Sequence, residues 1–93
     1  MNMEINPSEY KILIVDDVMS NVLLLKVLLT NEKFAIATAN NGQQALEQVD
    51  KEHPDLVLLD VMMPDLSGFE VAQRLKSNPD TADIPIIFLT ALN

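Results

Sequence analysis

The sequence predicts an α/β protein with one open, doubly wound parallel sheet. Short apolar segments alternate with longer segments of helical pattern along the 93 residues. The apolar segments are continuous rather than alternating, which is typical of strands buried on both faces. Strands joined by helices run parallel with right-handed crossovers, and a chain of this length allows a single small domain.

The first predicted elements are a strand over residues 11–15 and a helix over about residues 20–32. The strand is an apolar run that stops at an acidic pair. We expect Ser20 or Asn21 to cap the helix, because their side chains can accept hydrogen bonds from the unpaired amides at its start. A weaker apolar run over residues 34–39 predicts the second strand.

A second helix is predicted over residues 41–52. Asn41 and Gln44 have the spacing of a capping box, in which each side chain satisfies an amide near the other residue. The helical period places three apolar residues on the buried face: Ala45, Leu46 and Val49.

The third predicted strand, residues 56–59, ends at Asp60. Ser67 and Glu70 have capping-box spacing and predict a helix through about residue 77. Its expected core face consists of Phe69, Ala72 and Leu75.

The last predicted strand, residues 85–89, ends at Thr90. The residues before it, 78–83, are rich in the asparagine, proline and aspartate that favour turns. We find no internal repeat, low-complexity tract or linker in the sequence. The whole pattern therefore alternates strand and helix from one end to the other.

The charge of the chain excludes several functions. Fourteen acidic residues face six basic ones, for a net charge of −8, which repels nucleic-acid phosphates and anionic membrane surfaces. No apolar run approaches the roughly 20 residues of a membrane span, and the start of the chain lacks the pattern of a signal peptide. With no cysteine in the chain, we expect a cytoplasmic protein that binds neither nucleic acid nor membrane through this segment.

Acidic residues follow two of the predicted strands, with Asp16 and Asp17 after the first and Asp60 after the third. The carboxyl ends of parallel strands meet at one edge of a sheet, where ligands bind in open α/β folds. Each aspartate alone is explained equally well as a solvated turn or helix cap. Together they would repel one another unless a cation lay between them, and hard oxygen ligands suit Mg²⁺. Outside this cluster, His53 is expected to be an ordinary surface residue.

Three segments resemble the motifs of response-regulator receiver domains. They are residues 12–17 (Ile-Leu-Ile-Val-Asp-Asp), 58–64 (Leu-Leu-Asp-Val-Met-Met-Pro) and 88–91 (Phe-Leu-Thr-Ala). The match continues over residues 65–68, and motif order and spacing agree from about Lys11 to the last residue. The resemblance implies a flavodoxin-like receiver fold with strand order 2-1-3-4.

The resemblance also implies a role for each matching residue. Asp60 would accept a phosphoryl group from a histidine kinase or phosphotransfer protein, in an autocatalysed step rather than as a turnover enzyme. Asp17, Asp60 and the main-chain carbonyl of Met62 would ligate Mg²⁺, and Asp16 would hold a metal-bound water. Thr90 would donate its hydroxyl to the phosphoryl group and so switch contacts with an output domain or effector. Gly68 is expected to let the loop after the third strand approach neighbouring backbone closely.

The sequence departs from the family pattern at its end. Receivers continue through a fifth strand that carries a lysine and through a last helix, whereas the last basic residue here is Lys76. We therefore expect an N-terminal tail (residues 1–10) and an incomplete receiver domain (residues 11–93) without the fifth strand. Mg²⁺ binding should survive, whereas phosphorylation should be slow or undetectable.

The predicted first helix carries more apolar surface than one contact requires. Between residues 22 and 29 Lys26 is its only charge, so two neighbours should cover it. In receivers the last helix packs beside the first. Without that helix, we expect this surface and the open edge of the fourth strand to drive self-association or exchange of segments between chains.

Two other classes of function stay open. A Mg²⁺-dependent phosphohydrolase of the haloacid-dehalogenase type also uses an aspartate at a strand end, but such enzymes resemble Asp-x-Asp, whereas Asp16 and Asp17 are adjacent. Turnover of a generic phosphate ester would identify that class. An inactive, self-associating interaction fragment without a metal is the other alternative.

Overall fold

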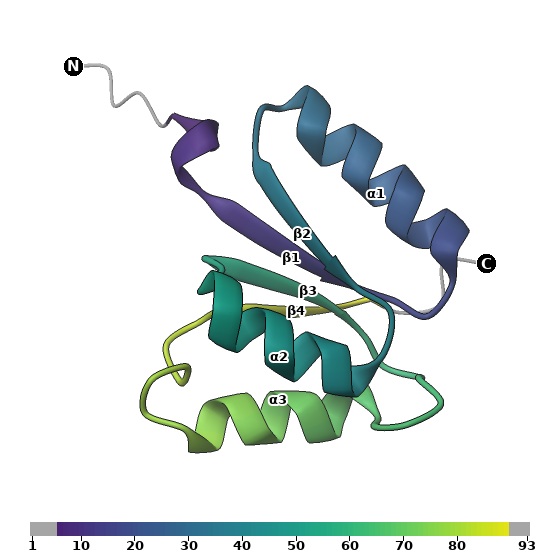
Figure 1. Cartoon of the computed structure of the whole chain (residues 1–93), viewed down its shortest axis with the longest axis vertical. Coiled ribbons are helices and arrows are strands. Elements are labelled where there is room, and N and C mark those ends of the chain that lie inside the picture. Colours follow the sequence, from purple (N-terminus) through teal and green to yellow (C-terminus); the bar gives the residue numbers. More distant parts are fainter. Residues whose placement is uncertain (1–5, 90–93) are drawn as a thin grey trace.

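The computed structural model describes residues 6–89 and confirms the predicted parallel sheet (Figure 1). The four strands have the order β2-β1-β3-β4, and every neighbouring pair is parallel. Helix α1 covers one face of the sheet, and α2 and α3 lie together on the other (Figure 1). The elements in chain order are η1 (Pro7–Glu9), β1 (Lys11–Val15), α1 (Met19–Asn31), β2 (Ala35–Ala39), α2 (Gly42–Glu52), β3 (Leu56–Asp60), α3 (Gly68–Ser77) and β4 (Ile86–Leu89).

The continuous apolar runs of the strands arise because both faces of the sheet are covered. In β1, Leu13 and Val15 face α2 and α3, whereas Ile12 and Ile14 face α1, and all four are buried. Successive side chains of a strand point to opposite faces, so a strand between two helical layers must be apolar at every position. Alternating polar residues would leave unpaired polar groups in one of the two cores.

Helices α2 and α3 begin with the side-chain caps that their spacing predicts. The Asn41 side chain accepts a hydrogen bond from the Gln44 amide at 2.8 Å, and Ser67 accepts one from the Glu70 amide at 3.1 Å. The return bond of the first box is shifted by one residue, because Gln44 accepts from the Asn40 amide at 3.1 Å. Both helix starts are therefore determined locally.

The predicted cap of α1 is wrong. The helix begins at Met19 with Val18 as its N-cap, and no side chain within residues 6–89 caps it. Asp16 stabilises this turn instead. Its carboxylate accepts hydrogen bonds from the Val18 amide at 2.9 Å and from the Asn21 side chain at 3.1 Å. Ser20 and Asn21 consequently lie inside the helix rather than before it.

The predicted core face of α3 is partly wrong. Leu75 is buried and Ala72 is half-buried, but Phe69 is 60% exposed and Val71 is fully buried in its place. The buried residues of the helix are Gly68, Val71 and Leu75. The first two lie one residue before the predicted positions, whereas Leu75 agrees with the prediction. Phe69 instead reaches the edge of the sheet, where its ring centroid lies 5.1 Å from that of Phe88 on β4.

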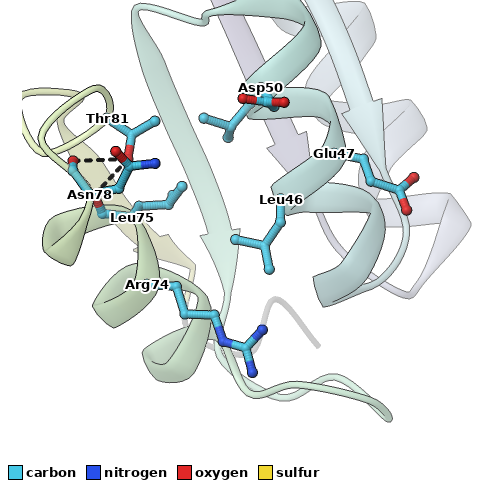
Figure 2. Close-up of a pocket in the computed structure, with 8 residues that line it drawn as sticks. Leu46, Glu47, Asp50, Arg74, Leu75, Asn78 and Thr81 are labelled. Atoms are coloured by element: carbon cyan, nitrogen blue, oxygen red, sulfur yellow. Dashed lines mark hydrogen bonds between the residues drawn. The ribbon is translucent and has the colours of Figure 1, made fainter.

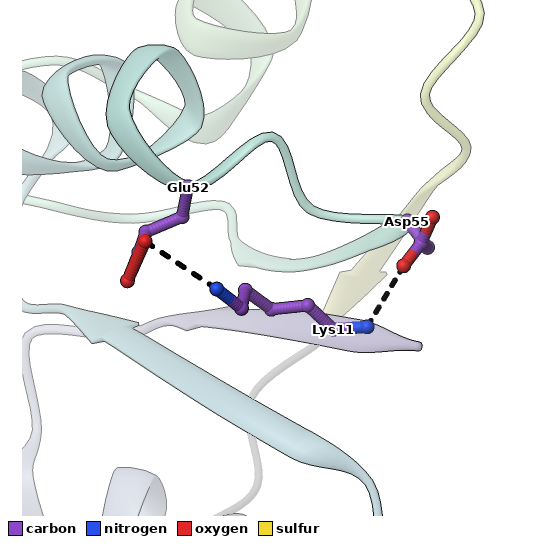
Figure 3. A network of polar contacts seen from close by, with 3 residues as sticks. All are labelled: Lys11, Glu52 and Asp55. Carbon is purple, nitrogen blue, oxygen red and sulfur yellow. Dashed lines mark hydrogen bonds and ion pairs between the residues drawn. The ribbon is translucent and has the colours of Figure 1, made fainter. Parts of the chain in front are cut away.

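Polar contacts tie the amino end of β1 to its neighbours (Figure 3). The Lys11 amide donates to the Asp55 carboxylate at 2.8 Å, and the Lys11 ammonium lies 3.4 Å from Glu52 at the end of α2. The ion pair is about one-third exposed on each side, so it adds little stability. His53 follows α2 in the left-handed conformation (φ 47°) and is exposed, as predicted for a surface residue.

Only one face of α1 is packed within the described part of the chain. Val22 is buried against the sheet, and Leu25 and Leu29 are partly buried beside it. Five other apolar side chains of the helix are more than half exposed: Met19, Leu23, Leu24, Val27 and Leu28. The expected cover on two sides is therefore absent among residues 6–89.

In the same range, no helix is both long enough and apolar enough to cross a membrane.

Candidate metal centre

The three aspartates of the sequence prediction converge at the carboxyl edge of the sheet. Asp16 and Asp17 directly follow β1, and Asp60 is the last residue of the adjacent strand β3. The register pairs Val15 with Leu59, so both strands end at the same level. One carboxylate oxygen from each aspartate lies within 4.8 Å of the others, a spacing that a single cation can bridge.

The two neighbouring aspartates have different environments. Asp16 is 2% exposed, and its two oxygens accept from the Val18 amide and the Asn21 side chain. Asp17 is exposed at the start of the turn. Asp16 is thus held in place by hydrogen bonds from the protein, whereas the side chain of Asp17 is accessible to solvent. Asn21 was missed by the sequence analysis as a site residue, although it lies close to Asp16 along the chain.

The pKa of the Asp60 carboxyl is raised above its ordinary value. Burial contributes most, followed by repulsion from the charge of Asp16, while a hydrogen bond from the Met62 amide at 3.4 Å acts in the opposite direction. A cation among the three oxygens would relieve this repulsion. The metal-free site is therefore electrostatically strained at neutral pH.

This strain predicts that Asp60→Asn stabilises the metal-free protein at neutral pH. A raised carboxyl pKa means that folding favours the protonated form, so this contribution is present below the unfolded-state pKa and is lost as pH rises through the folded-state pKa. Asparagine keeps the shape without the charge. In urea denaturation without metal, the variant should exceed wild type in free energy of unfolding at pH 7, and the difference should shrink toward about pH 4. A difference that is independent of pH would contradict the electrostatic origin.

The loop between β3 and α3 folds back tightly on Asp60. The Gly68 amide donates to the Val61 carbonyl at 2.7 Å, and a Cβ at Gly68 would collide with the main-chain oxygen of Asp60. This contact confirms the expected close approach of the loop at Gly68. Met62 is 80% exposed, so its side chain plays no part in the core.

The prediction for Thr90 falls outside the residues that the structure describes. The register of the last two strands pairs Leu89 with Asp60. The described end of β4 therefore lies beside the third aspartate of the cluster, on the side opposite β1. The role of Thr90 stays a prediction.

A hollow lies between α2 and α3 (Figure 2). It measures about 310 Å³ and is lined by Leu46, Glu47, Val49, Asp50, Arg74, Leu75, Asn78 and Thr81. Its buried hydroxyl, that of Thr81, already donates to the Leu75 carbonyl at 2.6 Å. None of the three aspartates lines it, so the sheet edge is the better candidate for chemistry.

The fold and the cluster together define an open α/β protein with three carboxylates gathered at its sheet edge. The chain belongs to the response regulator receiver domain family, whose model matches residues 12–93. This assignment confirms the resemblance seen in the sequence motifs.

Several known proteins are similar to the chain. Response regulator PleD of Caulobacter vibrioides is 46% identical over 83 residues, which are 89% of this chain and 18% of PleD. The "Probable transcriptional regulator ycf27" of Cyanophora paradoxa is 48% identical over 90 residues, or 97% of this chain and 36% of that protein. A "Probable cyclic di-GMP phosphodiesterase" of Vibrio cholerae is 44% identical over 90 residues, or 97% and 20%. The chain thus spans about a fifth to a third of the length of these relatives.

Solved structures agree with this family assignment. The N-terminal domain of a response regulator receiver protein from Methanoculleus marisnigri superposes with a TM-score of 0.86 at 41% identity, over 88% of this chain and 67% of that one. Chemotaxis response regulator CheY4 of Vibrio cholerae gives a TM-score of 0.83 at 29% identity, over 90% and 71%.

Proposed function

We propose that the chain is the phosphoacceptor receiver module of a two-component system, in which Asp60 accepts a phosphoryl group from a histidine kinase or phosphotransfer protein. The observation that carries this proposal is the convergence of three carboxylate oxygens within 4.8 Å at Asp60. An Asp60 oxygen attacks phosphorus, the bond from phosphorus to the histidine nitrogen breaks, and the imidazole leaves. The product is an aspartyl phosphate, so the module is a stoichiometric acceptor rather than a turnover enzyme.

The donor set fits Mg²⁺, which takes few protein oxygens and keeps several waters. Asp17 and Asp60 would hold the ion directly, with the main-chain carbonyl of Met62, while Asp16 would orient a metal-bound water. The buried, hydrogen-bonded state of Asp16 supports such an orienting role. When bound, Mg²⁺ offsets the charge that develops on the phosphoryl oxygens.

Thr90 would report the phosphoryl group to a partner surface by donating its hydroxyl to a phosphoryl oxygen. A covalent charge at Asp60 would thereby bias contacts near β4 with an output domain or effector. The relatives bear names of different outputs, a transcriptional regulator and a phosphodiesterase. We place the receiver unit at residues 11–93, after a tail of residues 1–10, and expect it to work in the cytoplasm without binding nucleic acid itself.

Chemical trapping tests the acceptor directly. The protein is incubated with Mg²⁺ and acetyl phosphate, reduced with borohydride, which converts an aspartyl phosphate to homoserine, and mapped by mass spectrometry. Homoserine should accumulate slowly at residue 60 and be absent from Asp60→Asn. Modification of another residue would contradict the proposal, and rapid labelling of residue 60 would contradict the expectation that phosphorylation is slow or undetectable. Steady turnover of p-nitrophenyl phosphate would instead favour a phosphohydrolase.

We also propose that the 93-residue chain self-associates through α1 and the edge of β4. Leu24 and Val27 are 56% and 60% exposed on α1, and Ile87 is 52% exposed on β4, which has β3 as its neighbour in the described sheet. In a dimer, the open edge of β4 could pair with a second strand, and the exposed apolar side chains of α1 could be covered by the other copy.

Sedimentation velocity at micromolar concentrations should show a reversible shift from monomer to dimer. Leu24→Glu combined with Val27→Glu should return the protein to monomer, whereas Gln43→Glu on the exposed side of α2 should not. A compact wild-type monomer throughout this range would refute self-association.

A further inference from the structure

The carboxylate of Asp65 joins the loop after β3 to the start of α2. One oxygen accepts a hydrogen bond from the Gly42 amide at 2.9 Å, and the other accepts from the Gln43 amide at 2.9 Å. These amides belong to the first turn of α2, where intrahelical partners are lacking. The two bonds hold the pKa of Asp65 below its ordinary value, the bond from Gly42 most of all, so the side chain is charged and suited to the positive end of the helix dipole.

The backbone at Gly42 adds a second constraint on the same contact. A Cβ at Gly42 would lie 2.6 Å from the Cβ of Leu66 and 3.2 Å from a methyl carbon of Val71. The loop residue after Asp65 therefore packs on α2 where no side chain fits between them. Hydrogen bonding and close packing both fix the loop at this point.

Helix α2 has its own cap without Asp65. The Asn41 side chain accepts from the Gln44 amide at 2.8 Å, which satisfies the usual capping position. The loop after β3 has less support than the helix start. Its first half makes one hydrogen bond to the acidic site, from the Met62 amide to Asp60 at 3.4 Å. The bidentate contact of Asp65 is thus more important for the loop than for the helix.

We propose that Asp65 is a positioning residue of the acidic site. Its two hydrogen bonds to the Gly42 and Gln43 amides form a clamp, which holds the loop so that the Met62 backbone stays beside the Asp60 carboxylate. The effect on metal binding rests on the proposed function, since the Met62 carbonyl would be a ligand there. The clamp itself is a property of the metal-free protein. It links residues 22 and 23 positions apart in the sequence.

The test compares Asp65→Ala with Asn41→Ala, which removes a cap of the same helix without touching the loop. In the metal-free protein, amide hydrogen exchange at Met62 and Gly68 should become about tenfold faster in Asp65→Ala, since hydrogen bonds to a charged group are being lost. Exchange at these two amides should stay close to wild type in Asn41→Ala. The Mg²⁺ dissociation constant, measured by NMR titration, should rise by a similar factor in Asp65→Ala alone.

Asp65→Asn provides a graded variant that also guards against misfolding of the alanine variant. Its amide oxygen can accept one of the two bonds, so both readouts should fall between wild type and Asp65→Ala. Equal effects of Asn41→Ala and Asp65→Ala would overturn the proposal and leave Asp65 as a helix cap. Faster loop exchange with unchanged Mg²⁺ affinity would also overturn the positioning role. If wild type binds no Mg²⁺, the proposed function fails, and the exchange rates alone decide on the clamp.

Discussion

Mg²⁺ should bind the folded chain saturably, and Asp17→Asn and Asp60→Asn should each weaken its affinity by about tenfold or more. Each substitution replaces a charged oxygen ligand in a cluster whose oxygens lie within 4.8 Å of one another. Titration by NMR or calorimetry measures the dissociation constant. Amide shifts at the ends of β1 and β3 should report the binding locally.

Asp83→Asn is the matched control for this experiment. It removes the same charge from an exposed aspartate in the turn before β4, toward the amino ends of the strands and away from the cluster. It should leave the Mg²⁺ affinity close to wild type, apart from a small change in overall charge. Binding that is equally insensitive to all three substitutions would show that the cluster is not the site.

Gly68→Ala should lower the free energy of unfolding by about 3 kcal/mol, as expected when an atom is forced into a packed position. The added Cβ would meet the main-chain oxygen of Asp60 and lie 3.0 Å from the Cα of Val61. These are backbone atoms, which cannot rotate away as a side chain can. The resulting shift should also reach the acidic site, because one of the displaced atoms belongs to Asp60 itself.

Urea denaturation of Gly68→Ala beside Ser67→Ala separates this clash from a general effect on α3. Ser67 caps the same helix start through its bond to the Glu70 amide, and its loss should lower stability by about 1 kcal/mol. If Gly68→Ala were no less stable than Ser67→Ala, the loop would have room to move, and the close approach would not be required.

The strands, their connections and the convergence of the three aspartates were predictable from sequence. Continuous apolar runs such as residues 11–15 require cover on both faces, and parallel strands must end at one edge. Asp16, Asp17 and Asp60 therefore meet whatever the details of the loops. The caps of α2 and α3 were equally accessible, because a cap acts on an amide about three residues away.

The positions of side chains that contact distant parts of the fold were determined by tertiary structure alone. Asp16 organises the start of α1 because it is already held at a strand end, and this overrides the local preference for Ser20 or Asn21. Phe69 is exposed because the close approach of Gly68 to the Asp60 backbone determines which face of α3 turns toward the core. Asp65 reaches Gly42 because of the path of the loop. Local periodicity determines an element to within about one residue, whereas a contact between distant residues depends on packing that no short segment encodes.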